Sequence, residues 1–503
     1  MLSYISCAAL AMGLWVAGSP VAALSASPAT PPQAQQSACL HLRDAYSAVT
    51  FLQGDLQYSK LRTKNWSRTA WRTPSCIFRP TSTRQLQGAL PLLVKSKTKF
   101  AIRSGGHSPS PQAANIDGGV LIDLSGFNRV AYNAASQVAV IGSGLTWGEV
   151  YAQLDPFGVT VVGGRVGGVG VGGLTLGGGL SYLSDLYGLA CDNVVNFEVV
   201  LANGTTVNSS ETHHKDLHWA LKGGINNFGI VTSFTVSTYS IGKVWAGIKT
   251  YKLEQLPALY DAMLKYQFTP EKDPYANLML QGFFSKETTG IMLSLVYLKP
   301  QEFPSAFAPF YHINATSDSM RMSNFSEFIA GQGPPSFPPR AYFRTAVFEP
   351  GQQLYNSLTS LMGNSGALKR VKSMKNGTVA FGMQPISTGL VQAGRDRGGN
   401  ALGLNLVNQT WFVINSGCEF AEDDELLRSA THDILGSIVE QSKTEQTHLP
   451  YLFMNDAGWD QNVLGSYGRD NVARLREVQA KYDESQVFQQ LVPGGYKIPP
   501  LCK

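Results

Sequence analysis

The sequence has little charge, little cysteine and no long apolar run, and each shortage excludes a class of protein. Charged residues make up 15% of the 503 residues, the formal net charge is +5 and no basic run occurs, so no nucleic-acid partner is expected. The six cysteines form no Cys-x-x-Cys pair and no Cys/His cluster, so no metal site is predicted. No segment repeats, which excludes solenoids and propellers. The length exceeds what one hydrophobic core serves, so more than one domain is expected.

The N-terminus predicts export. Residues 5–18 are mostly apolar, but the run is too short and too interrupted by glycine for a membrane span. Val21 and Ala23 suit the small-residue positions of a signal-peptidase site, although no Lys or Arg precedes the run. We therefore predict a signal peptide at 1–23 and a secreted protein with no membrane attachment after the signal peptide is removed. An anchor that stays attached is the alternative. Residues 24–37 are expected to form a disordered lead-in to an N-terminal segment that ends near residue 59.

Glycosylation motifs and cysteines also bear on whether the protein is secreted. Seven Asn-x-Ser/Thr sequons support export: Asn65, Asn203, Asn208, Asn314, Asn324, Asn376 and Asn408. Removal of Cys7 with the signal peptide leaves an odd number of cysteines, so at least one unpaired thiol is expected. Cys39 and Cys76 flank the start of the folded region and are the preferred disulfide pair. Cys191 lies in an apolar segment and is expected to be a buried free thiol.

Short strands alternate with helices from about residue 74 onward. The predicted strands are 99–103, 120–124, 130–134, 138–142 and 159–162. The predicted helices are 84–97, which Pro91 interrupts, 146–154 with Thr146 as N-cap, and 469–482. Between residues 242 and 450 glycine becomes rarer while aromatic residues and Met increase, which indicates a second, substrate-facing domain.

The most unusual stretch is residues 163–181, GGRVGGVGVGGLTLGGGLS. Its glycines alternate with Val and Leu, so it differs from a flexible linker and lets the backbone approach a flat or anionic ligand. A tight crossover between packed strands is the alternative. Gly168, Gly170 and Gly173 match the Rossmann G-x-G-x-x-G pattern, but more glycines follow where its helix should run, so that comparison is rejected.

Five segments in order resemble the berberine-bridge-enzyme-like group of FAD-linked oxidases. They are 103–107 (RSGGH), 163–179, 187–193 (YGLACDN), 223–231 and the C-terminal 467–488. The match spans residues 60–497, and the closing 492–497 is similar to fungal members. The resemblance implies an α+β fold. A two-part FAD-binding domain of the PCMH type would occupy 60–241, an α/β substrate domain with an antiparallel sheet 242–450, and a segment returning to the flavin domain 451–503.

The resemblance also implies the cofactor and its ligands. FAD would be attached covalently through His107 at its 8α-methyl carbon, with one link only, because Val166 stands where relatives carry a second, cysteine link. A valine at the position of Val169 goes with oxidases in this family. The other implied cofactor-binding residues are Arg103, Ser104, Gly105, Gly106, Ser108, Gly168, Val169, Gly170, Gly172, Gly173, Leu174, Asn193, Gly229, Ile230 and Val231.

The implied reaction is oxidation of a small molecule, with oxygen accepting the electrons. The missing cysteine and the aromatic content favour a hydrophobic intermediate of fungal secondary metabolism. A secreted carbohydrate oxidase and a flavin-bearing binding protein with little turnover are the alternatives. Tyr451 and Asn455 are the catalytic candidates, because the C-terminal segment of relatives passes over the flavin. Tyr451 would act as base if its pKa were lowered, and otherwise packs. No residue matches the glutamate base of some relatives, and no oligomeric state is predicted.

Overall fold

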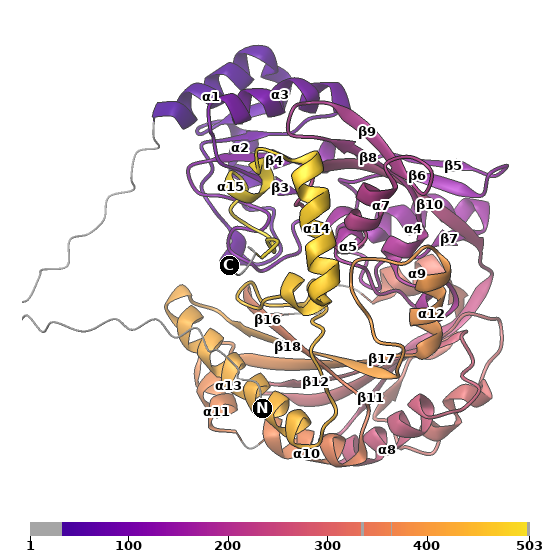
Figure 1. Cartoon of the computed structure of the whole chain (residues 1–503). Coiled ribbons are helices and arrows are strands. Elements are labelled where there is room, and N and C mark those ends of the chain that lie inside the picture. The colour runs from indigo at the N-terminus through magenta and orange to yellow at the C-terminus, as the bar shows by residue number, and fades with distance from the viewer. Residues whose placement is uncertain (1–32, 333–336, 364, 500–503) are drawn as a thin grey trace, which may run out of the picture.

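Three β-sheets organise the computed structural model, which describes residues 33–332, 337–363 and 365–499. The sheets form two bodies, one above the other in Figure 1, and the C-terminal segment runs between them. The predicted signal peptide lies outside the described residues, as do Cys7 and Cys502. Within the described ranges, no helix has the length and apolar character needed to cross a bilayer. No group of three His, Cys, Asp or Glu side chains in those ranges could hold a metal ion.

The first sheet has four strands in the order β1 (Thr50–Leu52), β2 (Cys76–Phe78), β4 (Val120–Asp123) and β3 (Phe100–Arg103). Strands β2 and β3 each pair with β4 in parallel, and β1 pairs with β2 antiparallel. The accompanying helices are α1 (Gln33–Ala45), α2 (Leu56–Arg62) and α3 (Thr83–Lys95). Helix α3 continues through Pro91, so the predicted interruption is wrong. Its apolar face, including Leu86, Leu90 and Leu93, is fully buried and holds the helix in place.

A disulfide joins Cys39 on α1 to Cys76 on β2, as predicted. Helix α1 begins at Gln33, inside the stretch 24–37 that was expected to be disordered, so that expectation is wrong for its last five residues. The reason is tertiary, because the disulfide and the fully buried Leu42 fasten the helix to the first sheet. Cys191 and Cys418 are buried free thiols, which confirms the prediction for Cys191.

Removing this disulfide is expected to lower the free energy of unfolding. The bond closes a loop with a sequence separation of 37, for which chain entropy predicts about 3–4 kcal/mol. Urea unfolding of a Cys39→Ser/Cys76→Ser variant measures the loss, and a reductant should bring the wild type to the same midpoint. A reductant that destabilises the double variant equally would show that another bond is responsible.

The second sheet is antiparallel and holds the middle of the upper body. Its strands run β5 (Val130–Asn133), β6 (Val138–Gly142), β10 (Ile230–Ser240), β8 (Val194–Val200) and β9 (Thr206–Ser210), and β7 (Val159–Val161) also pairs with β10. Its helices are α4 (Trp147–Leu154), α5 (Val171–Leu176), α6 (Ser184–Tyr187) and α7 (Lys215–Leu221). Thr146 and Glu149 form a capping box at the start of α4, as expected for an N-cap at Thr146.

Helix α5 corrects one step of the sequence argument. A helix does form among the glycines, although none was expected there. The Rossmann strand-to-helix arrangement is nevertheless absent. Strand β7 ends at Val161 and helix α5 begins only at Val171, so the helix does not follow the strand directly.

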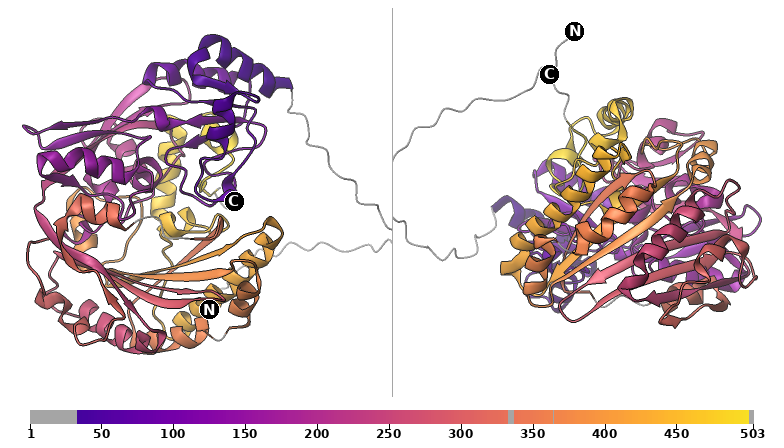
Figure 2. Two further views of the ribbon diagram at one scale, coloured as in Figure 1. Left: turned by 180° about the vertical axis from the view of Figure 1, so that it is seen from behind. Right: turned by 90° about the horizontal axis from the view of Figure 1, so that it is seen from below.

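The third sheet makes up the lower body and is antiparallel throughout. Its strands run β14 (Ser317–Asp318), β11 (Lys243–Tyr251), β13 (Thr289–Tyr297), β12 (Ala276–Phe284), β17 (Thr378–Ile386), β18 (Gln409–Cys418), β16 (Arg340–Phe348) and β19 (His448–Leu449), and β15 (Arg321–Asn324) pairs with β11. The face turned away from the upper body is covered by α8 (Leu256–Gln267), α10 (Gln352–Gly363), α11 (Gly366–Ser373) and α13 (Asp424–Thr444) (Figures 1 and 2). The predicted boundary at residue 242 lies between β10 and β11.

Two short helices of the lower body touch the upper one. Helix α9 (Phe325–Gly331) packs against α4, and α12 (Thr388–Asp396) packs against α6. The other face of the third sheet is thereby turned toward the upper body (Figure 1), and Gln384 of β17 accepts a hydrogen bond from Arg165 of the glycine-rich stretch. This arrangement places residues from both bodies around one region.

The C-terminal segment returns to the upper body after β19 and is yellow in Figure 1. It contains the 3-10 turn Met454–Asp456, α14 (Arg469–Tyr482) and α15 (Val487–Gln490). Helix α14 has the predicted bounds. The backbone N–H of Phe100 on β3 donates to the carbonyl of Leu491 at 2.9 Å, so the segment is fastened to the first sheet.

Candidate flavin site

The loop that carries His107 leaves strand β3 at Arg103, whose side chain anchors it from below. The Arg103 guanidinium pairs with the carboxylate of Asp123 at 2.8 Å and donates to Asn65 Oδ1 at 2.9 Å. Neither charged side chain of this pair is exposed. Burial alone would raise the pKa of Asp123, but the charge and hydrogen bond of Arg103 outweigh burial and lower it. Arg103 therefore supports the loop, and direct contact with FAD stays a prediction.

The His107 loop and the glycine-rich stretch meet backbone to backbone. A Cβ atom placed on Gly105 would lie 2.5 Å from Gly170 Cα, and one on Gly170 would lie 2.6 Å from Gly105 Cα. Ser104 Oγ reinforces the contact, since it donates to the Ser143 carbonyl at 2.6 Å and accepts from Gly172 N–H at 3.1 Å. Glycine is required on both sides because a side chain would force the two loops apart.

His107 lies against an aromatic side chain that sequence reasoning missed. The imidazole stacks on Trp66 with ring centroids 4.7 Å apart and an interplanar angle of 9°. The backbone N–H of Trp66 donates to the Gly106 carbonyl at 2.9 Å, which ties the backbone of Trp66 to the same loop. Phe343 of β16 lies 5.7 Å from Trp66, so the lower body closes over this pair. No sequence signal marked Trp66, because its partners come from distant segments.

Enclosure of His107 decides its protonation. Burial lowers the pKa of His107 to about 4, so the imidazole is neutral at neutral pH. A neutral imidazole has one ring nitrogen with a free lone pair, which makes it a nucleophile toward an activated carbon. Ser108, the next residue, has its hydroxyl oxygen occupied by the Ser110 N–H at 3.2 Å. In this loop, therefore, the side chain chemically suited to a covalent bond is His107.

The glycine-rich stretch has a packed side and an open side. A Cβ atom on Gly163 or Gly179 would lie within 2.7 Å of other atoms, whereas one on Gly168 or Gly173 would meet no atom within 4 Å. Val169 and Leu174 are partly exposed beside these open positions. Open glycine backbone lets a flat ring system approach closely. The residues present therefore fit a flavin, and contact of Gly168 and Gly173 with it stays a prediction.

The remaining predicted ligands lie in the framework behind the loop. Asn193 is buried, donates to the carbonyls of Tyr187 (2.9 Å) and Leu189 (2.8 Å), and accepts from Tyr239 Oη at 2.6 Å. Ile230 and Val231 are buried at the start of β10. A Cβ on Gly229 would lie 2.5 Å from Val199, so this position needs glycine for packing. Direct FAD contact by these four residues stays a prediction.

Asn455, one of the two catalytic candidates, holds the glycine-rich stretch from the C-terminal segment. Asn455 Oδ1 accepts from Gly179 N–H at 3.0 Å, and its Nδ2 donates to the Gly173 carbonyl at 3.3 Å. The Asn455 amide therefore binds both Gly173, within α5, and Gly179, just after its end. This geometry makes Asn455 a positioning residue, and a catalytic role stays a prediction.

Tyr451, the other catalytic candidate, is enclosed by aromatic rings. It packs 5.4 Å from Trp411 and 5.9 Å from Tyr467, and its hydroxyl has no hydrogen-bond partner among the described residues. Burial raises the pKa of Tyr451 well above its usual value. Tyr451 could act as a base only if its pKa were lowered, and burial raises that pKa instead. Tyr467 donates to the Gly223 carbonyl at 3.2 Å, which fixes its ring beside Tyr451.

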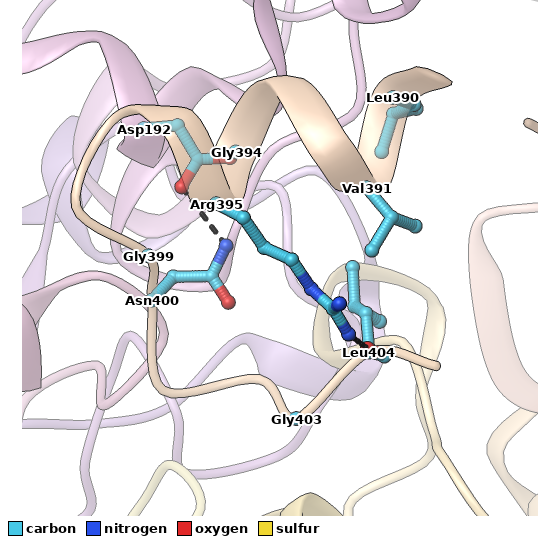
Figure 3. A pocket seen from close by; sticks show the side chains of 9 residues that line it. All are labelled: Asp192, Leu390, Val391, Gly394, Arg395, Gly399, Asn400, Gly403 and Leu404. Atoms are coloured by element: carbon cyan, nitrogen blue, oxygen red, sulfur yellow. Dashed lines mark hydrogen bonds between the residues drawn. The ribbon is translucent and has the colours of Figure 1, made fainter. Parts of the chain in front are cut away.

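A separate small cavity lies behind the Asn193 segment, between α12 and the loop that follows it (Figure 3). Its volume is about 160 Å³, below the several hundred Å³ of typical ligand sites. Asn400 Nδ2 donates to Asp192 Oδ1 at 2.9 Å on one side of it. None of the predicted flavin ligands lines this cavity, so it is not the flavin site.

Comparison with known proteins identifies the family. A family model described as an FAD binding domain matches residues 74–210. The bifunctional solanapyrone synthase of Alternaria solani is 36% identical over 459 residues, covering 90% of this chain and 87% of that protein. An FAD-dependent monooxygenase of Arthrobotrys oligospora is 38% identical over 446 residues, covering 87% and 85%. The structure of BBE-like 1 from Physcomitrella patens superposes with a TM-score of 0.73 at 19% identity, covering 92% of this chain and 99% of that one.

The chain belongs to the berberine-bridge-enzyme-like FAD-linked oxidoreductases.

Membership confirms the resemblance, the α+β fold of the PCMH type and the prediction of an FAD-dependent enzyme. A chitooligosaccharide oxidase and the xylooligosaccharide oxidase of Myceliophthora thermophila share the fold at 18% identity, a level that shows the fold alone. The glucooligosaccharide oxidase of Acremonium strictum, also 18% identical, is described as carrying FAD bound through both a cysteine and a histidine. That Val166 stands at the position of the cysteine link in this oxidoreductase stays a prediction.

Adding one methyl group at Gly173 is expected to reduce FAD binding while leaving folding intact. In Gly173→Ala the new Cβ meets no protein atom, and alanine in helix α5 is worth up to about 1 kcal/mol of stability. The same methyl would occupy space that we assign to FAD, so flavin content should fall roughly tenfold. Flavin absorbance per protein and thermal unfolding measure the two effects. Gly436→Ala, in helix α13 and equally free of neighbours, is the control and should keep its flavin.

Proposed function

We propose that this enzyme holds FAD covalently through His107 and oxidises a small, hydrophobic natural-product intermediate, with oxygen as the electron acceptor. The observation that carries the proposal is the neutral His107 beside the Gly105–Gly170 contact, at the open side of the glycine-rich stretch. Such a site brings a nucleophilic nitrogen to the edge of a flat cofactor that the backbone can approach closely.

The covalent link would be single. Val166 has no thiol, and neither free cysteine among the described residues, Cys191 or Cys418, lies in the glycine-rich stretch. Trp66 holds the plane of the imidazole by stacking, and the buried surroundings keep the ring neutral and therefore nucleophilic. A fixed, neutral histidine suits one permanent bond to the cofactor.

The cofactor supplies the redox chemistry, which is acceptance of two electrons from the substrate as a hydride. The chain supplies binding, orientation and exclusion of water. Oxidation of an alcohol to a carbonyl, dehydrogenation, or dehydrogenation that leads to ring closure would all suit this site. The name of the Alternaria solani relative, a solanapyrone synthase, supports a natural-product substrate and a place in fungal secondary metabolism. Val169 supports reoxidation by oxygen.

Secretion and glycosylation belong to the same proposal. The Cys39–Cys76 disulfide suits an oxidising compartment. Of the seven sequons, Asn203, Asn208, Asn314 and Asn376 are exposed, and we expect glycans there. Asn65 is buried and its amide binds Arg103 and the Ala114 carbonyl, so it should stay unmodified. Mass spectrometry of peptides from the secreted protein tests these assignments, and a glycan on Asn65 would contradict this structure.

Hydrogen peroxide release tests the reaction. The purified holoenzyme is offered hydrophobic alcohols and polyketide-like enones in parallel with oligosaccharides, and peroxide is measured. Peroxide with the hydrophobic set alone supports the proposal. Peroxide with oligosaccharides alone would establish a carbohydrate oxidase instead. Flavin reduction without peroxide would show that oxygen is not the acceptor, and neither reduction nor peroxide across the panel would favour a flavin-bearing binding protein.

A further inference from the structure

A chain of polar side chains links the glycine-rich stretch to the third sheet and to the C-terminal segment. Arg165 donates to Gln384 Oε1 on β17, and Gln384 Nε2 donates to Asp456 Oδ2 at 2.7 Å. The Arg165 guanidinium also lies 5.9 Å from the centre of the Tyr182 ring. Three segments far apart in sequence therefore meet here, and none of these residues was singled out from the sequence.

This cluster adjoins the flavin site. Arg165 precedes the open Gly168 by three residues in the same loop. Asp456 directly follows Asn455, whose amide binds both Gly173 and Gly179. Arg165 and Asp456 are both partly exposed. The cluster thus lies where a substrate held against the open side of the glycine-rich stretch would be within reach.

The cluster offers more hydrogen-bond donors than acceptors. Tyr182 Oη and Gln332 Nε2 are enclosed and face each other, and neither has a partner of good hydrogen-bond geometry among the described residues. The Arg165 guanidinium has a neutral amide oxygen as its hydrogen-bond partner, and the Asp456 carboxylate acts on it through charge, with no hydrogen bond between the two. Asp456 accepts the Gln384 NH₂ group, which turns the other end of that amide toward Arg165. A cation and unpaired donors in a low-dielectric region are costly unless a negatively charged or strongly accepting oxygen joins them.

The surroundings of the cluster are apolar. Phe328 of α9 lies 5.7 Å from Tyr182, and Ile329 is the nearest neighbour of a Cβ placed on Gly167. On the other side, Trp411 of β18 packs against Phe453 with ring centroids 4.2 Å apart. A site with apolar walls and hydrogen-bond donors at one end favours a ligand with an apolar body and a hydrogen-bond-accepting oxygen at one end.

We propose that Arg165, together with Tyr182 and Gln332, binds an acidic oxygen of the substrate, such as an enolate, a phenolate or a carboxylate on an apolar body. Asp456 acts through Gln384, whose amide it orients toward Arg165. This inference rests on the proposed function and specifies its substrate class. The planar guanidinium can hold such an oxygen through two N–H groups, which a lysine cannot reproduce.

Calorimetric titration of the holoenzyme with benzoate and with benzamide tests the assignment, because the two probes share their shape and differ in charge. We expect the wild type to bind benzoate at least about tenfold more tightly than benzamide. Arg165→Gln should abolish that preference, and the control Arg395→Gln, at an exposed arginine in the last turn of α12, should retain it. A preference that survives in Arg165→Gln, or one absent from the wild type, overturns the proposal.

If thermal unfolding and flavin content show that Arg165→Gln does not fold, a second variant tests the binding site. Tyr182→Phe removes only the hydroxyl and should weaken benzoate binding severalfold while leaving benzamide unchanged. Equal binding of benzoate by Tyr182→Phe and the wild type would then count against the site. Covalent flavin and peroxide release are measured separately, so a failure of the proposed function is distinguishable from a failure of this binding site.

Discussion

Replacement of His107 by alanine is expected to abolish covalent attachment of the flavin. Acid precipitation of the wild type should leave the yellow colour in the pellet and on a peptide that contains His107. In His107→Ala the colour should move to the supernatant, with less than about a tenth of the flavin retained, because the loop has no other histidine and no cysteine or tyrosine. Some FAD should still bind without the covalent bond, since the Gly105–Gly170 contact remains.

Two further variants make this result specific. His213→Ala, at an exposed histidine on the surface, should keep its flavin in the pellet. Trp66→Leu should give partial attachment, because the imidazole loses the ring that holds its plane but keeps its nitrogen. Full covalent flavin in His107→Ala would move the link to another residue and contradict the proposal.

The second large effect is expected at the buried ion pair beneath the loop. Asp123→Asn removes the charge that balances Arg103, and both side chains are fully buried. An uncompensated buried cation costs about 3–5 kcal/mol, and the His107 loop begins at this arginine. Urea unfolding should show the loss, and flavin content should fall with it.

An exposed pair of the same chemistry provides the control. Arg370 and Asp433 also form an Arg–Asp pair, but their side chains are 41% and 52% exposed. Asp433→Asn is therefore expected to change stability by less than about 1 kcal/mol. Equal effects of Asp123→Asn and Asp433→Asn would show that burial of the Arg103 pair contributes nothing.

The Asp123 pair also predicts a pH dependence. Its pKa is lower in the folded protein than the ordinary value of 3.8. The pair therefore stabilises the fold fully above that value, and the contribution is lost as pH falls through the lower, folded pKa. The difference in stability between the wild type and Asp123→Asn should accordingly narrow below about pH 4. A difference that stays constant into strong acid would contradict the assignment.

Local signals account for the elements that sequence reasoning placed correctly. The capping box at Thr146 and the helical spacing of 469–482 lie within single segments, so their bounds could be recognised without the fold. The errors at α1 and at Pro91 in α3 have one cause. Each helix is held by contacts with the first sheet, which override a local preference for disorder or interruption.

By itself, the sequence determined the family and the cofactor and predicted the histidine that we propose to hold it, because glycine spacing and motif order are properties of neighbouring residues. The tertiary structure alone decided which side chains surround that histidine and what they do. Gln384 reaches Arg165 across 219 positions, and Asn455 reaches Gly179 across 276. Burial then set the charge on His107 and raised the pKa of Tyr451, and burial depends on packing that no local pattern encodes.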